Sequence, residues 1–189
     1  MIAQSWVGPS DRVIRRADLD SVAEISAIIR EVAPLAFAGV GTPQQLRRWV
    51  DQHSRESTII ARILDPCSMT MLAQNEDGLV VGTAYLMLHV EGENTDGYIG
   101  GLYCRVRGRG WGPLLISRLS EMAESLGAHR VSLSVAAKNN RMLEVVARLG
   151  FREVNRYLDR EFFTDDTFLT LSSPLPLFGS TSPAAGVNE

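Results

Sequence analysis

The chain has 189 residues, of which 45% are hydrophobic and 22% charged, and its formal net charge at pH 7 is −3. This length suits one domain with its own hydrophobic core. The mild negative charge argues against a dedicated nucleic-acid binder. No apolar run reaches membrane-spanning length, and the first residues lack the pattern of a secretory signal. Cys67 and Cys104 form no spaced framework, so we expect a reduced, cytoplasmic setting. From the hydropathy and the net charge we expect no membrane and no nucleic-acid partner.

The first third of the chain predicts one short strand followed by helices. Apolar residues at 3–4 spacing follow a capping aspartate, and a second capping box has proline at the first helical position. The predicted elements are a strand over 11–17, a helix capped by Asp18 and ended by Pro34, a helix capped by Thr42, and a short helix over 57–64.

The remainder of the chain predicts a sheet with two further helices. A hairpin signal, Asp77-Gly78, joins two strand-like runs. The predicted elements are strands over 69–74 and 79–90, an acidic loop over 91–97, a strand over 98–104, a helix ending at Gly127, a strand over 130–135, a helix over 141–149 capped by Asn139 or Asn140, and a last hairpin over 152–162 and 167–172. We expect a single α+β domain over 1–172, with a mixed central β-sheet flanked by helices, and a flexible tail over 173–189.

The most informative stretch joins the strand at 98–104 to a helix that opens at Pro113. Between them, Gly108, Gly110 and Gly112 alternate with Arg107 and Arg109. A glycine turn before a helix leaves several N–H groups pointing the same way, at the positive end of the helix dipole. Such a turn is a cradle for an anion, and the arginines add positive charge to it.

A glycine turn alone is weak evidence, because a plain tight turn before a helix has the same composition. Two better-known phosphate motifs do not fit. The pattern GxxxxGK[ST] is absent, and the pattern GxGxxG fails because Pro113 stands where its third glycine is required.

Two separate patterns resemble the GNAT (GCN5-related) N-acetyltransferase family. The family's acyl-CoA signature, Gln/Arg-x-x-Gly-x-Gly/Ala, is matched by Arg107, Gly110 and Gly112. A second family pattern has Leu-x-Val, an Asn, and Gly-Phe eleven residues after that Asn. It is matched at Leu133, Val135, Asn139, Gly150 and Phe151, so the resemblance covers roughly residues 13–171.

The resemblance implies that acetyl-CoA is the acyl donor and that an acceptor amine attacks its thioester directly, without a metal or a covalent enzyme intermediate. A backbone N–H of the strand before the glycine turn would polarise the thioester carbonyl. The residues implied in cofactor binding are Leu102, Tyr103, Cys104, Arg107, Gly108, Arg109, Gly110, Trp111, Gly112 and Asn139.

The sequence departs from the family's chemistry at three places. Many relatives carry a carboxylate base on the strand that here reads Gly100-Gly101, and a tyrosine acid at the position of Val146. The link between Cys104 and Arg107 is also about two residues shorter than usual. The cofactor half of the site is therefore better defined than the catalytic half.

Several side chains are candidates for proton transfer, each with an ordinary structural alternative. A base could come from Glu91, Glu93 or Asp96 in the acidic loop, or from His89; a solvated turn and a strand end are the alternatives. Ser134 could contact the acceptor, and Tyr157 or Tyr103 could protonate the leaving thiolate; sheet packing is the alternative. We expect Cys104 to be a small buried apolar residue and not a nucleophile.

Three functions stay open from the sequence. The first is acetylation of a small-molecule amine, the second is acetylation of a protein N-terminus or lysine, and the third is non-catalytic binding of acyl-CoA. The resemblance places the acceptor between the loop after the first helix and the last hairpin, where Phe37, Val40, Asp159, Glu161, Asp165 and Asp166 are expected. Apolar and acidic walls of this kind would suit a cationic amine as the acceptor. For the oligomeric state, we keep a homodimer as an alternative to a monomer.

Overall fold

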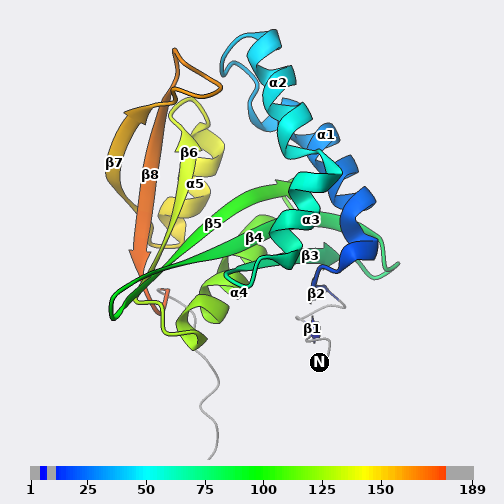
Figure 1. Cartoon of the computed structure of the whole chain (residues 1–189), viewed down its shortest axis with the longest axis vertical. Helices are drawn as coiled ribbons and strands as arrows, with labels where there is room; N and C mark the ends of the chain where they lie inside the picture. The colour runs from blue at the N-terminus through cyan, green and yellow to red at the C-terminus, as the bar shows by residue number, and fades with distance from the viewer. Residues whose placement is uncertain (1–4, 8–11, 178–189) are drawn as a thin grey trace, which may run out of the picture.

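The computed structural model describes residues 5–7 and 12–177 (Figure 1). Residues 1–4, 8–11 and 178–189 lie outside the described residues, and most of the predicted tail over 173–189 lies there with them. The first residues of that tail belong to the fold instead, because a strand extends to Pro174 and Leu177 is buried in the core. The helices are α1 (Val22–Ala36), α2 (Pro43–His53), α3 (Glu56–Leu64), α4 (Trp111–Ser125) and α5 (Asn140–Arg148), with a 3-10 turn η1 (Leu19–Ser21) before α1. The strands are β1 (Ser5–Val7), β2 (Val13–Arg16), β3 (Ser68–Gln74), β4 (Val80–Glu91), β5 (Asn94–Cys104), β6 (Arg130–Ala136), β7 (Arg152–Leu158) and β8 (Thr167–Pro174).

The strands form one mixed sheet in the order β1-β2-β3-β4-β5-β6-β8-β7. Neighbouring strands are antiparallel except β5 and β6, which are parallel and are connected through α4. The predicted mixed α+β architecture is therefore confirmed, with β1 as an addition. The parallel pair matters for function because β5 and β6 separate beyond their few paired residues.

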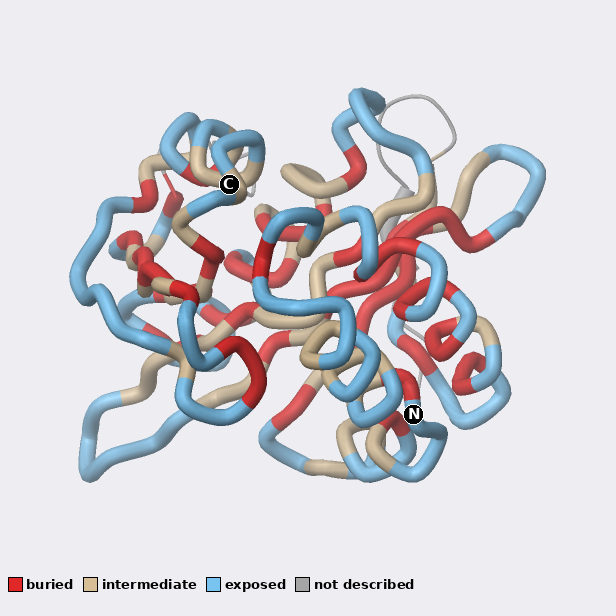
Figure 2. The backbone as a smooth tube through the Cα atoms, turned by 90° about the horizontal axis from the view of Figure 1, so that it is seen from above, coloured by how far each residue is buried: buried red, intermediate tan, exposed pale blue. Residues whose placement is uncertain are grey.

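Helices cover both faces of the sheet, and the buried backbone of the strands runs between them (Figures 1 and 2). Alternate residues of β3 show how the chain builds the two cores. Leu72 packs with Ile25 and Ile28 of α1, while Met71 and Ala73 belong to the core of α4 on the opposite face. This alternation is the two-residue period of a strand buried on both sides.

The helix starts follow the capping signals of the sequence. Thr42 and Gln45 form a reciprocal capping box at α2, and the Asn139 side chain accepts from the Met142 N–H at α5. Asp18 caps the 3-10 turn that leads into α1. The helix does not end at Pro34, as predicted, but continues to Ala36, because a proline in the last turn removes only one hydrogen bond.

Two predicted segments are corrected. The acidic loop over 91–97 is shorter than expected, since β5 begins at Asn94 and the turn is confined to the residues around Gly92. The last hairpin also differs, because β7 ends at Leu158. There the Asp159 Oδ1 accepts hydrogen bonds from the N–H groups of Glu161, Phe162 and Phe163, which folds the chain inward.

No helix within residues 5–7 and 12–177 is both long and apolar enough to cross a bilayer.

Candidate active site

A cavity lies where β5 and β6 separate. The two strands pair only at Asp96–Arg130, Gly97–Val131 and Tyr98–Ser132, and beyond these pairs they diverge (Figure 1). The cavity between them has a volume of about 260 Å³ and is lined by β5 from Tyr98 to Tyr103 and by β6 from Leu133 to Ala136. Strand edges that face a gap present unpaired N–H and C=O groups to whatever fills it.

An irregularity in β5 helps to open the gap. Tyr85 pairs with Gly100 and Thr83 with Tyr103, so two steps along β4 oppose three along β5. The extra residue is accommodated at Gly101, whose φ is +59°, a left-handed conformation that favours glycine. The Tyr85 ring lies against Gly100 and Gly101, the positions where the resemblance leads one to expect a carboxylate.

The glycine turn at the end of β5 has the geometry of an anion cradle. Gly108 and Gly110 have φ of +77° and +80°, and Gly110 is the N-cap of α4. Among the residues that the structure describes, none accepts a hydrogen bond from the backbone N–H groups of residues 107–112. Free N–H groups at a helix N-terminus bind phosphate, so these residues fit the pyrophosphate of CoA.

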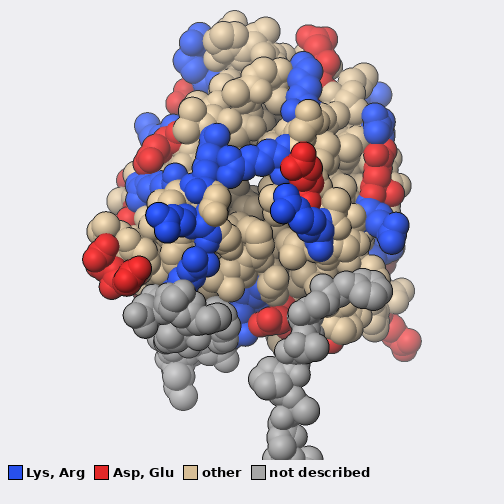
Figure 3. Space-filling model, turned by 180° about the vertical axis from the view of Figure 1, so that it is seen from behind, with Lys and Arg blue, Asp and Glu red and all other residues tan. Residues whose placement is uncertain are grey.

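The positive charges around the turn have different roles. Arg105 is held by Glu31 at 2.8 Å, by Glu24 at 3.4 Å and by the Val80 carbonyl at 2.9 Å, so it is occupied within the fold. Arg107 and Arg109 are exposed, and the Arg12 guanidinium lies 4.9 Å from the centre of the Trp111 ring. Figure 3 shows Lys and Arg side chains gathered around a hollow on the face opposite to that of Figure 1.

Most of the other predicted cofactor residues lie along the cavity, whereas Cys104 does not belong to its lining. Leu102, Tyr103 and Asn139 line it, and the Asn139 amide also donates to the Ala36 carbonyl at 3.4 Å. Tyr103 is 6% exposed, and burial raises the pKa of its hydroxyl well above its usual range. Burial also raises the pKa of the Cys104 thiol to about 12, so this thiol is protonated and is a poor nucleophile.

The predicted base candidates of the acidic loop and strand end lie away from the cavity. Glu91, Glu93 and His89 are exposed at the far end of the β4–β5 hairpin. Asp96 forms an ion pair with Arg130 at 2.6 Å. None of these four residues belongs to the cavity lining. The structure therefore brings no carboxylate of this hairpin to the point where β5 and β6 diverge.

Ser134 and Tyr157 do line the cavity. The Ser134 side chain acts on the hydroxyl of Tyr98, whose pKa burial raises to about 12. The Tyr157 ring is stacked on Phe168 at 6.1 Å and is 37% exposed. Val146, where the resemblance leads one to expect a tyrosine, is fully buried in the core and has no proton to give.

His53, at the end of α2, is a titratable cavity residue that sequence reasoning missed. Its Nδ1 lies 2.8 Å from the Trp49 carbonyl, and because a carbonyl can only accept, Nδ1 carries the proton. The Nε2 of the neutral ring is then free to accept. Burial lowers the pKa of His53 below its ordinary value, and Arg62 acts in the same direction, so the ring is neutral at pH 7.

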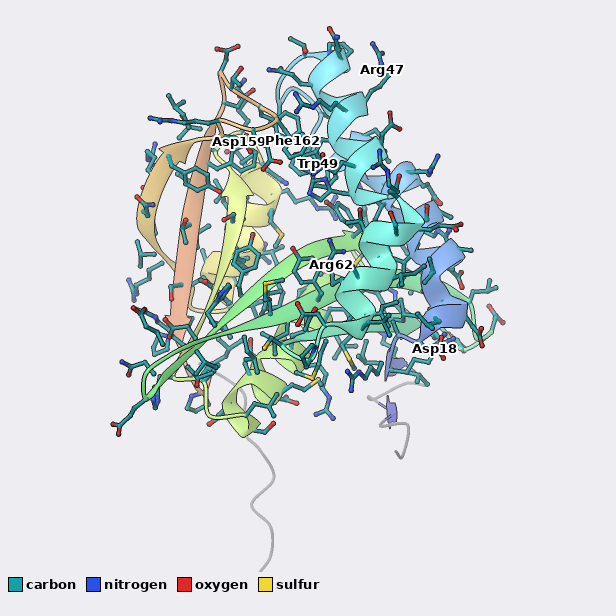
Figure 4. The ribbon with its side chains drawn as sticks, in the orientation of Figure 1. Asp18, Arg47, Trp49, Arg62, Asp159 and Phe162 are labelled. Atoms are coloured by element: carbon teal, nitrogen blue, oxygen red, sulfur yellow. The ribbon has the colours of Figure 1, made fainter. Side chains whose placement is uncertain are left out.

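Two charged side chains complete the lining. Arg62 reaches the cavity from α3 and its guanidinium lies 4.2 Å from the centre of the Tyr85 ring. Asp159 lies at the end of β7, and Figure 4 shows it near Trp49 and Phe162, above Arg62. Of the acceptor-wall residues expected from the sequence, Phe37 and Asp159 line the cavity, whereas Glu161 and Asp165 are exposed.

A roof closes one side of the cavity, formed by the α1–α2 loop (residues 37–42) and the β7–β8 loop (residues 159–166). The Asp166 carboxylate accepts from the Gly41 N–H and pairs with Lys138 at 2.6 Å, and Gln45 donates to Thr164 at 3.2 Å. Beneath these bonds lies an aromatic cluster: Phe37, Val40, Leu46, Trp49, Phe162, Phe163 and Phe168. The roof therefore joins segments about 120 residues apart in the chain by both polar and apolar contacts.

One sequence signal could have drawn attention to His53. Trp49 and His53 are four residues apart, so they share one face of α2, and an aromatic pair on a helix face is a candidate pocket wall. Arg62 carries no comparable signal, because an arginine on a helix of mixed composition is ordinarily solvated. Among the described residues, no group of three or more His, Cys, Asp or Glu side chains is arranged to hold a metal ion.

Comparison with known proteins shows the family of this chain. The chain matches the acetyltransferase (GNAT) family over residues 37–151, and it belongs to that family. It is an acetyl-CoA-dependent N-acetyltransferase. An uncharacterized N-acetyltransferase of Mycobacterium tuberculosis is 28% identical over 131 residues, which are 68% of this chain and 81% of that protein.

Solved structures show the same fold. The PaiA N-acetyltransferase of Thermoplasma acidophilum in complex with coenzyme A has a TM-score of 0.71 at 14% identity, covering 86% of this chain and 98% of that one. Mutant forms of the spermidine/spermine N-acetyltransferase SpeG of Vibrio cholerae have a TM-score of 0.64 at 16% identity, covering 86% and 93%.

Proposed function

We propose that this enzyme acetylates a small-molecule amine, by direct attack of the amine on the thioester of acetyl-CoA. The observation that carries the proposal is the roof over the cavity. A protein N-terminus or a lysine on a folded protein needs an open groove that a chain can cross. Here the Asp166 contacts and the aromatic cluster around Phe163 hold the two loops of the roof together, which supports a compact acceptor over a polypeptide.

Donor binding is assigned to the glycine turn and to the open edge of β5. The free N–H groups of residues 107–112 and the exposed Arg107 and Arg109 would hold the pyrophosphate. Leu102 and Tyr103 would offer backbone groups to the pantetheine arm in the gap. The thioester then lies in the cavity near Gly100 and Gly101, where a backbone N–H can stabilise the developing oxyanion.

We assign the role of general base to His53, which replaces the acidic-loop candidates. In this step the amine nitrogen forms a bond to the acetyl carbon, the carbon–sulfur bond breaks, and the amine proton passes to His53 Nε2. The Trp49 carbonyl fixes the required tautomer at 2.8 Å, and the lowered pKa keeps the ring neutral at pH 7. Asp159 and Glu161 act in the opposite direction on this pKa, so they favour the imidazolium once it forms.

The leaving thiolate needs a proton, and Tyr157 is the candidate donor that lines the cavity and is also partly exposed. A thiol leaves readily near neutral pH, since its reference pKa is about 8.5. The contribution of Tyr157 is therefore at the low end for general acids, about 10²-fold. A Tyr157→Phe variant that keeps its CoA affinity and loses this much in kcat would support the assignment; an unchanged kcat would leave water as the donor.

The proposal also covers the cellular location, the domain organisation and the oligomeric state of the enzyme. Cys67 and Cys104 are both free thiols, which favours a reduced, cytoplasmic location. We propose one catalytic domain that runs past the predicted end at residue 172, since β8 extends to Pro174 and Leu177 is buried in the core. A homodimer stays an alternative to a monomer.

The test is a screen for CoA thiol release from acetyl-CoA. Small amines, lysine-containing peptides and N-terminal peptides are each offered to the wild-type protein. We expect turnover with at least one small amine and at least ten-fold lower kcat/KM with every peptide. Preference for peptides would overturn the small-molecule assignment in favour of protein acetylation, and tight CoA binding without any turnover would favour a binding module.

A further inference from the structure

Arg62 places a positive charge inside the cavity without an acidic partner of its own. Among the described residues, no carboxylate forms an ion pair with Arg62, although eight other ion pairs are present in the fold. Its guanidinium instead lies over the Tyr85 ring at 4.2 Å, and Figure 4 shows it pointing from α3 into the central opening. Stacking on an aromatic ring fixes a guanidinium in place and leaves its N–H fork free.

Arg62 lies close to the residues that we assign to the reaction. Arg62 acts electrostatically on both His53 and Tyr103, and Tyr85 lies against Gly100 and Gly101. The nearest acidic cavity residue is Asp159, whose Oδ1 is already engaged by three backbone N–H groups. An unpaired, half-buried cation close to the base is unfavourable for an acceptor that carries only positive charge.

We propose that the acceptor is an amine that also carries a carboxylate, and that Arg62 binds this carboxylate. The inference rests on the proposed function and narrows its substrate class. The planar fork of arginine matches a carboxylate with two parallel hydrogen bonds, which fixes orientation as well as position. The amino group of the same molecule then faces His53, and its positive charge is favoured by Asp159 and Glu161, which also act on that histidine.

The rest of the acceptor is apolar. Beyond Arg62 and His53, the cavity walls include aromatic side chains of the α1–α2 loop, α2, β7 and β8: Phe37, Trp49, Tyr157 and Phe168. Trp49 contacts both Phe37, at 4.8 Å between ring centroids, and Phe163, at 6.5 Å. Such a wall favours an aliphatic or aromatic body between the two charged ends.

The experiment compares matched amines that differ only in the carboxylate. L-phenylalanine is paired with phenethylamine, L-leucine with isoamylamine, and 5-aminopentanoate with pentylamine, and CoA release is measured with each. We expect the wild-type enzyme to favour the acid of at least one pair by roughly 10- to 100-fold in kcat/KM, the range of a charge-assisted hydrogen bond. Equal rates within every pair, or preference for the amines without a carboxylate, would overturn the inference.

Variants assign the preference to the side chain. Arg62→Gln should remove the preference by raising KM for the acid, while the affinity for CoA stays within about two-fold. The readout is the ratio between the acid and its matched amine, because Arg62 also lowers the pKa of His53 and its loss changes the rate with both. Arg62→Lys should restore part of it, since the charge returns without the fork. Arg47→Gln is the matched control, because Arg47 is an exposed arginine of α2 that points away from the cavity (Figure 4).

A binding measurement separates this inference from the proposed function. N-acetyl-L-phenylalanine and N-phenethylacetamide, with and without the carboxylate, are titrated calorimetrically into the CoA-bound protein. Tighter binding of the acid, lost in Arg62→Gln, supports the carboxylate subsite even if no amine is turned over. Turnover of amines with no effect of Arg62→Gln on any carboxylate ligand would leave the proposed function standing and overturn the inference.

Discussion

Gly100 lies directly beneath the hydroxyl end of the Tyr85 ring. A Cβ atom at Gly100 would approach Tyr85 Cζ and the hydroxyl oxygen to 2.4 Å, and at Gly101 it would approach the same ring to 2.9 Å. The missing carboxylate on this strand is thus coupled to the presence of Tyr85, because the ring fills the space that a side chain would need. Arg62 covers the same ring, so one aromatic side chain links the glycines to the cation of the cavity.

The first prediction concerns this contact. Gly100→Ala should destabilise the protein by about 1–3 kcal/mol, the range of an overpacked core, and should cost much less in a Tyr85→Ala background. Unfolding in urea measures both differences. Gly112→Ala is the control, since a Cβ there would lie 3.8 Å from Leu102, an ordinary contact. A Gly100→Ala penalty that is the same with and without Tyr85 would disprove the coupling.

The second prediction concerns the anion cradle. Gly110 and Gly127 both have positive φ, at +80° and +85°, at the two ends of α4. Valine at either position should cost about 1–2 kcal/mol in stability, because both backbones are left-handed. Only Gly110→Val should also weaken CoA binding, by at least ten-fold in calorimetry, since it obstructs approach to the free N–H groups. If the two variants bind CoA alike, the cradle is assigned to the wrong residues.

The third prediction concerns the roof. The Lys138 ammonium and then the Gly41 N–H lower the pKa of Asp166, which is 4% exposed. A carboxyl whose folded pKa lies below its unfolded value stabilises the fold at higher pH, and this contribution is lost as pH falls through the folded pKa. Asp166→Asn should therefore lower the free energy of unfolding by roughly 1–3 kcal/mol at pH 7, and by progressively less as pH falls below the ordinary carboxyl pKa of 3.8 toward the lower pKa of the folded state.

The control for the roof is Asp165→Asn, one residue away and exposed. It should leave the melting temperature unchanged at both pH values. An Asp166→Asn penalty that persists undiminished at low pH would mean that the charge of this carboxyl does not hold the roof.

The sequence predicted those parts of the molecule that depend on local chemistry. The capping box at Thr42, the cap at Asn139 and the glycine turn each need only neighbouring residues, and the structure places them as expected. The Asp77-Gly78 turn also lies between two strands, as predicted. These signals were sufficient for the fold, and they carry the proposed place of the cofactor.

The predictions that were wrong concern segments whose structure depends on contacts with residues far away in the chain. The strand pattern was extended through Phe162, but the Asp159 side chain captures three N–H groups and turns the chain into the aromatic cluster. Asp96 was placed in an acidic loop, but it extends β5 and pairs with Arg130 of β6. Arg62 was missed because its environment is created by the separation of β5 and β6, which no periodicity encodes. His53 was missed although its spacing from Trp49 on α2 was a signal, because that spacing does not show what the helix face contacts.

The central claim is that His53 removes the amine proton, and the pH dependence of kcat/KM tests it most directly. For the wild-type enzyme we predict a plateau with an acidic limb below the ordinary histidine pKa of 6.5, because burial and Arg62 lower the pKa of His53 and the base is lost as pH falls through it. His53→Gln should lose about 10²–10⁴-fold at pH 7, and its rate should rise with pH toward the pKa of the free amine. His89→Gln, on the exposed end of β4, should match the wild type. A His53→Gln enzyme with the wild-type rate and the same acidic limb would contradict the account.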